Sequence, residues 1–235
     1  MVTGTLELHG YPASNYFNIV RAALIEKDLP HRIVIANAAQ HAAFLAMNPM
    51  GKIPVLHSPD GWIAETVAIG EYLDDRYPEN PLRPDAPGDR AKARQIVNII
   101  QMYVEAPARA LFPGVFGNGE NSAGTIAATR AVLDRATAAL TRLMQPDPYL
   151  FGGRPGFADL FAFYNLDIAD RITRFVYDRS IIGEIGTLAD WHVRMLARTS
   201  SHVVLADFEP YFVQYLNDHG APYRADINPR PPAHA

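Results

Sequence analysis

Two hydroxyl side chains stand where a predicted helix begins. Ser14 comes directly before apolar residues at helical spacing that continue to Leu24, and Thr66 opens a second such run that continues to Tyr77. A hydroxyl at a helix start accepts a hydrogen bond from a backbone N–H two or three residues later, so capping is the simplest role for both. The same positions attract anions, because the first N–H groups of a helix are unpaired and its dipole is positive there. The pattern therefore predicts two helix caps, either of which could also bind an anionic group.

Between them lies the segment Asn48-Pro49-Met50-Gly51-Lys52-Ile53-Pro54-Val55-Leu56. Gly51 permits a tight turn, and the apolar residues after it predict a short buried strand. Pro54 has no N–H to donate, so it belongs at the beginning of that strand. If the Ile53–Pro54 bond is cis, the backbone N–H and C=O of Ile53 are free to meet an extended ligand. Only about 5–6% of such bonds are cis, so the pattern alone does not establish this geometry.

The surrounding elements predict two domains. Strand patterns at 6–9, 31–35, 52–56 and 62–64 alternate with the helices begun by Ser14 and Thr66 and with a short helix between 37 and 47. The order β-α-β-α-β-β-α fits one mixed four-stranded sheet with helices on both faces. Four prolines between 78 and 87 predict a stiff linker. Helical periodicity at 89–112, 122–144, 157–172, 179–184 and 187–198 then predicts an all-helical bundle. The expected boundaries are 1–77, a linker at 78–88, a helical domain at 89–208 and a C-terminal tail at 209–235.

Composition excludes several function classes. The 235 residues are 49% apolar with a net charge of −4, and the basic residues are scattered, so no nucleic-acid footprint is visible. There is no cysteine, which rules out disulfides and any enzyme thiol. The histidines show no metal-ligand spacing. Neither a signal peptide nor an apolar run of membrane-spanning length is apparent, so we expect a cytoplasmic protein with no membrane partner.

The motif Asn48-Pro49-x-Gly51-Lys52-Ile53-Pro54-x-Leu56, followed by Glu65-Thr66-x-Ala68-Ile69, resembles the glutathione-site signature of soluble glutathione transferases. The resemblance covers roughly residues 4–205 and is most specific in the first half. It implies a thioredoxin-like N-terminal domain, a cis Ile53–Pro54 bond, glutathione as co-substrate without a metal, and a homodimer. Met50 falls where some members insert an apolar residue into the partner subunit.

The resemblance also implies a donor to the sulfur of glutathione. Ser14 precedes Ala23-Leu24 by the spacing typical of Ser-type members, in which the serine hydroxyl favours the thiolate. Tyr11 lies where Tyr-type members keep their donor, give or take one residue, and Asn15 could present an amide instead. We rank Ser14 before Tyr11 and Asn15. Because the chain has no cysteine, the thiol-disulfide and dehydroascorbate-reducing classes are disfavoured.

The remaining roles follow from the same resemblance. Thr66 and Glu65 would hold the γ-glutamyl end of glutathione, Ile53 would pair its backbone with the cysteinyl part, and Lys52 would reach the glycyl carboxylate. Gln40 or His41 could help there. The second substrate would lie in the crevice between the domains, against Tyr103, Arg109 and Phe112.

One position departs from the family pattern. Gly156 stands where a Ser or Thr normally caps the central bundle helix, three residues before Asp159. A glycine is tolerated at a helix N-cap at small cost.

The resulting hypothesis is a detoxification-type glutathione transferase that attacks a small hydrophobic electrophile with a glutathione thiolate. The alternative is a binding or regulatory protein that keeps the fold without turnover.

Overall fold

A computed structural model describes residues 5–226 of the chain. Its sheet contains β1 (Leu6–Gly10), β2 (His31–Ile35), β3 (Val55–Ser58) and β4 (Gly61–Ala64) in the order β2-β1-β3-β4. β1 and β2 are parallel, whereas β3 is antiparallel to both of its neighbours. The predicted mixed four-stranded sheet is confirmed.

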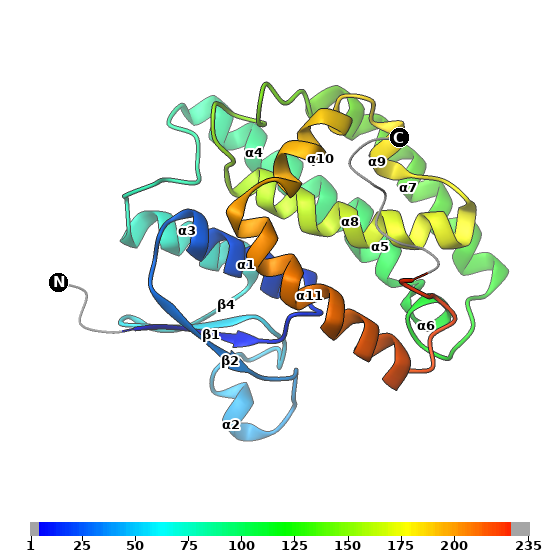
Figure 1. Cartoon of the computed structure of the whole chain (residues 1–235), viewed down its shortest axis with the longest axis horizontal. Helices are drawn as coiled ribbons and strands as arrows, with labels where there is room; N and C mark the ends of the chain where they lie inside the picture. The colour runs from blue at the N-terminus through cyan, green and yellow to red at the C-terminus, as the bar shows by residue number, and fades with distance from the viewer. Residues whose placement is uncertain (1–4, 227–235) are drawn as a thin grey trace.

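Three helices complete the first domain (Figure 1). α1 (Asn15–Glu26) and α3 (Thr66–Arg76) lie between the sheet and the helical domain, and the short α2 (Ala42–Leu45) lies on the other side of the sheet. The inner face of β1 presents Leu6 and Leu8 to this layer, where both are buried. The fold is therefore thioredoxin-like, with its helical face covered by the second domain.

A buried ion pair fixes the start of the linker. Lys27 at the end of α1 donates to Asp74 of α3 at 2.7 Å, and to the carbonyl oxygens of Glu79 and Asn80 at 3.2 Å. Asp74 also accepts a hydrogen bond from the backbone N–H of Leu82 at 3.0 Å. Because both charged groups are almost fully buried and well hydrogen-bonded, this pair specifies the path of the chain between the domains.

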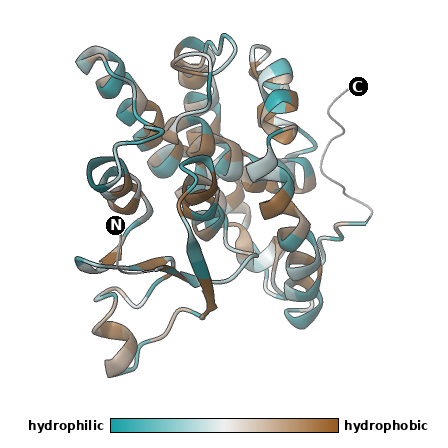
Figure 2. Cartoon of the chain, turned by 60° about the vertical axis from the view of Figure 1, so that its left-hand side comes forward, coloured by the Kyte–Doolittle hydropathy of each residue, from teal (hydrophilic) through white to brown (hydrophobic). Residues whose placement is uncertain are grey.

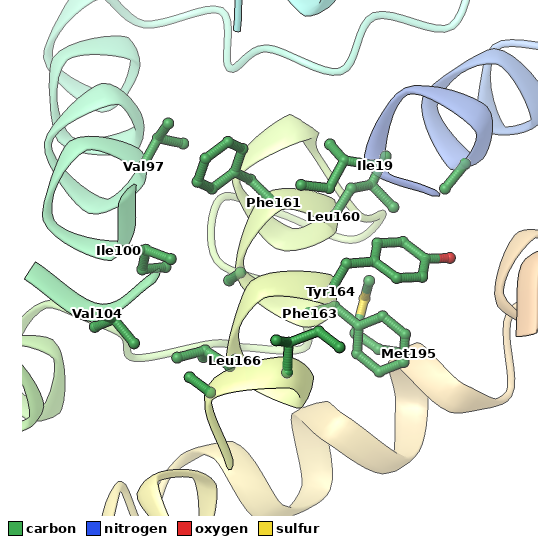
Figure 3. Close-up of a cluster of buried hydrophobic side chains, with 14 of the residues drawn as sticks. Ile19, Val97, Ile100, Val104, Leu160, Phe161, Phe163, Tyr164, Leu166 and Met195 are labelled. Carbon is green, nitrogen blue, oxygen red and sulfur yellow. The ribbon is translucent and has the colours of Figure 1, made fainter. Parts of the chain in front are cut away.

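The second domain is all-helical. Its elements are α4 (Pro87–Ile100), a π-helical turn η1 (Gln101–Glu105), α5 (Ala106–Arg109), α6 (Phe112–Val115), α7 (Ala123–Leu143), α8 (Phe157–Tyr177), α9 (Ile181–Glu184), α10 (Leu188–Leu196) and α11 (Thr199–Asp218). α8 is the central helix. Figure 3 shows Val97 and Ile100 of α4 on one side of α8 and Ile19 of α1 on the other, so one apolar core joins the two domains.

The first bundle helix differs from the continuous helix predicted at 89–112. Pro107 lacks an N–H and crowds the carbonyl of the residue four positions before it, so the regular hydrogen-bond ladder cannot continue there. The N–H of Ala106 instead bonds to Gln101 O, the wider spacing of a π-turn. This turn ends at Glu105, whose buried carboxylate accepts a hydrogen bond from Asn15 at the start of α1.

The expected tail at 209–235 was wrong in its first part, because residues 209–218 belong to α11. Val204, Phe208, Phe212 and Leu216 recur every four residues and are buried, which offsets the cost of Pro210 inside the helix. Beyond α11, the buried Tyr223 packs against Phe116 and Phe212. The rest of the expected tail, from residue 227 on, lies outside the described residues.

The structure explains the glycine at position 156. A Cβ there would lie 2.7 Å from Leu82 O, the atom that accepts the N–H of Phe157 at 2.7 Å. Asp159 still receives the N–H of Gly156 at 2.9 Å, and it also accepts from Leu150 N and from Trp191 Nε1. The glycine therefore makes room for the linker, while the aspartate alone supplies the cap.

Figure 2 shows that, on most helices, the hydrophobic residues lie along the face turned toward the interior and the hydrophilic residues along the outer face. Within residues 5–226, none of the helices combines the length and the apolar character needed to cross a bilayer. The same residues contain no group of three or more histidine and carboxylate side chains placed to hold a metal ion.

Candidate active site

The sheet brings the motif residues to one end. The β1–β3 pairing ends at His9↔Val55, and continuing it two residues further places Tyr11 level with Ile53. Continuing the β3–β4 pairing in the same way places Ile53 level with Thr66. Three segments that are far apart in sequence therefore meet where β1 ends and α1 begins. This extrapolated register puts the motif residues Ile53 and Thr66 at the end of the sheet from which α1 starts.

The loop before β3 is shaped by Asn48 and Gly51. The buried Asn48 side chain accepts from Met50 N at 2.9 Å and donates to Lys52 O at 2.8 Å. Gly51 has φ +64°, and a Cβ on it would lie 2.4 Å from Ala39 O, so only glycine fits. The Lys52 side chain is exposed. His41 is also exposed, and its Nδ1 accepts from Phe44 N at 3.2 Å as the N-cap of α2.

The Ile53–Pro54 peptide bond is cis. Ile53 lies just before β3, and its N–H and C=O form no hydrogen bond with any residue in the range 5–226. An extended peptide could therefore form two backbone hydrogen bonds with this residue, one to its N–H and one to its C=O, as neighbouring strands of a sheet do.

Glu65 and Thr66 form the start of α3, but not in the way the sequence predicts. The N-cap is Glu65, at φ +68°, and no side chain among the described residues caps the helix. Thr66 is the first helical residue, only 6% exposed, so the prediction that its hydroxyl caps α3 was wrong. Positive φ at a non-glycine residue costs of order 1–3 kcal/mol. This strained, uncapped helix start leaves backbone N–H groups available to an anion.

Ser14 begins α1 and does cap it. Its Oγ accepts from Phe17 N at 3.3 Å, as predicted. None of the described residues accepts the hydrogen of this hydroxyl, which lines a cavity of about 90 Å³ together with Tyr11 and Asn15. Burial raises the pKa of the Tyr11 phenol above its usual value, so the phenol is also a protonated donor at neutral pH.

Asn15 is committed to a buried network instead. Its amide nitrogen donates to Asn165 Oδ1 at 2.6 Å and to Glu105 Oε1 at 3.3 Å, and its Oδ1 accepts from Arg109 Nη2 at 3.2 Å. Glu105, only 3% exposed, also accepts from Arg109 Nε at 2.8 Å and from Tyr16 OH at 2.9 Å. Burial first, and the Glu105 charge second, raise the pKa of Tyr16. The network ties the start of α1 to the helical domain.

The far wall of the cavity comes from the helical domain. Arg109 and Phe112 line it, and the guanidinium of Arg109 lies 4.5 Å from the centroid of the Phe112 ring. Tyr103 is not among the lining residues; it is 47% exposed on η1. Sequence reasoning missed five other lining residues, Ala13, Phe116, Ile168, Phe212 and Tyr215. The four-residue apolar period of α11 was the signal that could have revealed Phe212, and Tyr215 lies three residues further along the same helix.

The thioredoxin-like sheet, the cis bond before Pro54 and the attached helical domain define a class of two-domain, glutathione-site proteins. The family model described as the N-terminal domain of glutathione S-transferase matches residues 8–81, and the model for its C-terminal domain matches residues 123–194. The chain belongs to the glutathione S-transferase family.

Individual relatives agree with this placement. A glutathione S-transferase of Pseudomonas putida is 33% identical over 171 residues, which are 73% of this chain and 78% of the relative. The crystal structure of a glutathione S-transferase from Methylobacterium radiotolerans in complex with glutathione sulfonate has a TM-score of 0.68 at 25% identity, covering 86% of this chain and 94% of that one. A probable elongation factor 1-gamma of Arabidopsis thaliana is 28% identical over 61% of this chain and 35% of its own length.

Proposed function

We propose that the protein is an enzyme that activates glutathione as a thiolate and adds it to a small hydrophobic electrophile. The observation that carries the proposal is the position of Ser14. Ser14 lines the cavity, its hydroxyl has no acceptor among the described residues, and the extrapolated strand register puts Ile53 and Thr66 at the same end of the sheet. A peptide held along Ile53 with its amino-acid head at Thr66 would extend toward that hydroxyl.

The chemistry needs a stabilised thiolate. A free thiol has a pKa of about 8.5, so only a few per cent is ionised at neutral pH. Ser14 stands at the positive end of the 12-residue α1 and can donate to the sulfur while accepting from Phe17 N. The hydrogen bond and the helix dipole both favour the charged form and would lower the pKa of the thiol. The thiolate then attacks an electrophilic carbon in the cavity, and the leaving group departs with its electron pair.

The binding side of the proposal uses main-chain groups. The uncapped N–H groups at the start of α3, with the Thr66 hydroxyl, would bind the α-carboxylate of the γ-glutamyl residue, and the exposed Glu65 carboxylate would face its ammonium. Ile53 would pair with the cysteinyl backbone. Lys52 would attract the glycyl carboxylate, with Gln40 or His41 beside it.

The electrophile would bind against aromatic side chains. Phe112, Phe116, Phe212 and Tyr215 give the cavity an apolar wall, and Arg109 supplies a cation at its edge. We also propose a homodimer, since Met50, an apolar side chain, is 64% exposed and could reach a partner subunit. Sedimentation equilibrium measures that state directly.

The second candidate is a binding or regulatory protein without turnover. The similarity to elongation factor 1-gamma supports it, as does the fact that Ser14 Oγ already has a capping role. Retention on immobilised glutathione, with no turnover on a broad panel of electrophiles, would favour this candidate over the enzyme.

Replacing the two remaining sulfur-donor candidates tests the proposal. We expect Ser14→Ala to lower kcat/KM with a chlorinated aromatic by about 10- to 100-fold, because a hydrogen bond to a charged group is worth about 1.5–3 kcal/mol. Tyr11→Phe keeps the aromatic ring and should change kcat/KM by less than about 3-fold. The ultraviolet absorbance of bound thiolate against pH should show a raised thiol pKa in Ser14→Ala alone. If Tyr11→Phe is the more damaging change, Tyr11 is the sulfur donor and the assignment of Ser14 is wrong.

A further inference from the structure

The connection between β1 and α1 is a tight turn that carries two of the candidate sulfur donors. Ser14 N donates to Tyr11 O at 3.1 Å, which closes a four-residue β-turn with Pro12 at its second position, where proline is favoured. Tyr11, Ala13 and Ser14 line the cavity of the candidate active site, whereas Pro12 does not. The place of all three lining residues in the cavity therefore depends on the backbone conformation of this turn.

The side chain of Asn18 holds the carbonyl of Pro12. Pro12 is a buried residue, so its carbonyl oxygen needs a hydrogen-bond donor from the protein. Asn18, one turn into α1, supplies that donor, since its Nδ2 donates to Pro12 O at 2.8 Å. The asparagine is only 1% exposed. Because a carbonyl oxygen can only accept, the nitrogen end of the amide must face Pro12.

The other end of the same amide is left without a bond. Asn18 Oδ1 is buried and has no hydrogen-bond partner in the described part of the chain. An unsatisfied buried oxygen costs stability, so the amide gains from one of its ends and loses from the other. An apolar side chain of similar size would avoid the unpaired oxygen. An asparagine that adds little net stability points to a role in geometry rather than in folding.

The Ser14 hydroxyl is held only weakly by its own contact. The capping bond from Phe17 N to Ser14 Oγ is 3.3 Å long, above the usual length of about 2.9–3.0 Å. The position of the hydroxyl therefore depends largely on the backbone of the turn. Asn18 contacts this backbone twice, through its side chain at Pro12 and through its own N–H, which donates to Ser14 O at 3.0 Å.

We propose that Asn18 is a positioning residue, which sets the place of the Ser14 hydroxyl in the cavity by holding the carbonyl of Pro12. The inference rests on the proposed function, in which this hydroxyl donates to the sulfur of glutathione. Asn18 is not among the residues that line the cavity, so it acts on the chemistry only through the turn. A hydrogen bond weakens steeply as its geometry worsens. A displacement of about 1 Å at a reacting group can cost about 100-fold in rate.

Two variants of Asn18 remove the donor and differ in volume. Asn18→Leu fills the space of the amide, and Asn18→Ala leaves it empty. We expect each to lower kcat/KM with a chlorinated aromatic by about 10-fold, through kcat, because the Ser14 hydroxyl is displaced rather than removed. The ultraviolet absorbance of bound thiolate against pH should show a raised thiol pKa in both. KM for glutathione should stay within about 2-fold, since Ile53 and Thr66 would bind the peptide from other segments.

A double-mutant cycle tests whether Asn18 acts through Ser14. If it does, Ser14→Ala combined with Asn18→Leu should be no worse than Ser14→Ala alone, because the group that Asn18 positions is already absent. A purely structural role would instead multiply the two losses. Circular dichroism and urea denaturation measure the fold and stability of each variant, and the denaturation midpoint of Asn18→Leu should be close to that of the wild type.

Thr187→Val is the matched control for the Asn18 variants. It also removes a side-chain donor to a main-chain carbonyl, because Thr187 Oγ1 donates to Met144 O at 2.8 Å, but within the helical domain. It should leave kcat/KM and the thiol pKa unchanged.

The possible outcomes separate this inference from the proposed function. A large loss in Ser14→Ala, with wild-type kcat/KM and thiol pKa in both Asn18 variants, would leave the proposed function intact and overturn the positioning role. Losses that multiply in the double variant, or a loss in only one of the two Asn18 variants, would mean that Asn18 acts through packing, which also overturns it. Wild-type protein that binds glutathione without forming the thiolate would contradict the proposed function itself, and with it the donor that Asn18 is proposed to position.

Discussion

The glutathione side and the electrophile side of the proposed site are held by different kinds of structure. The glutathione side consists largely of main-chain groups at Ile53 and at the start of α3, within a stretch that ends at Thr66. The electrophile side consists of side chains from both domains, from Tyr11 to Tyr215. A main-chain site depends on backbone conformation, so few sequences support it. A side-chain wall can change residue by residue without altering the fold.

Glu105 is where the two sides join. Its carboxylate, at the end of the π-turn, receives hydrogen bonds from Asn15 and Tyr16 of α1 and from Arg109 of α5. It therefore fixes the beginning of α1, next to Ser14, and also the cation that lines the electrophile cavity. In the proposed site, the contact between the domains, rather than either domain alone, would set the geometry between the sulfur and the electrophile.

The largest effect is expected for Glu105→Ala. The change leaves the amide of Asn15, the hydroxyl of Tyr16 and the guanidinium of Arg109 without their shared acceptor. We expect the free energy of unfolding to fall by about 2–3 kcal/mol, because hydrogen bonds to a buried charge are lost. Urea denaturation measures it.

Glu71→Ala is the control for Glu105→Ala, since it also removes a glutamate that pairs with an arginine, but on the exposed surface. It should cost about 0–1 kcal/mol. If the two variants are equally stable, Glu105 does not join the domains.

Thr66→Val tests the glutathione side alone. It keeps the shape of the buried side chain and removes the hydroxyl proposed to bind the γ-glutamyl carboxylate. We expect KM for glutathione to rise about 10-fold, as for one hydrogen bond to a charged group, with kcat within about 2-fold. Thr125→Val removes a hydroxyl from the first turn of α7 and should leave both constants unchanged. A fall in kcat with unchanged KM would mean that Thr66 acts in the chemical step and not in the binding of glutathione.

Tyr215→Ala tests the electrophile side alone. The ring lines the cavity and is stacked on His219, with 4.0 Å between the ring centroids. Its loss should raise KM for an aromatic electrophile about 5-fold, through reduced apolar contact worth about 1 kcal/mol, and leave KM for glutathione unchanged. Tyr211→Ala, one turn earlier on α11 and 40% exposed, is the matched control. If Tyr211→Ala and Tyr215→Ala raise KM equally, both changes act by destabilising α11 and not by removing a contact with the electrophile.

The same contrast explains what the sequence could predict. The mixed sheet and the gathering of Ser14, Ile53 and Thr66 follow from short motifs, because strand order and register bring contiguous segments to one edge. Gly51 and Pro54 are informative because few other residues can adopt their backbone geometry. The proposed site could be outlined from these positions together with the family resemblance.

The electrophile wall could not be predicted in this way. Phe212 and Tyr215 lie on α11, beyond the expected end of the helical domain at residue 208, and Glu105 is oriented by a π-turn that depends on Pro107. Tyr103 shares the helical periodicity of its neighbours, yet the altered turn leaves it in solvent. Such positions depend on tertiary packing, which outweighs local propensity. The predicted N-cap of α3 was wrong by one residue. Glu65, with its strained backbone, is the N-cap, and Thr66 is the first residue of the helix.

The smallest effect is expected for Lys52→Ala, and it sharpens the comparison because Lys52 would act on the glutathione side through the charge of an exposed side chain rather than through main-chain groups. The residue is exposed, so its attraction for the glycyl carboxylate should be worth less than about 1 kcal/mol. KM for glutathione should rise about 2- to 4-fold at low salt, and the difference should disappear near 0.5 M salt, where screening shortens the range of the charge. Lys92→Ala, an exposed lysine on α4 that pairs with Asp89, should have no such effect. A large, salt-independent rise in KM would mean that Lys52 binds glutathione by direct, desolvated contact.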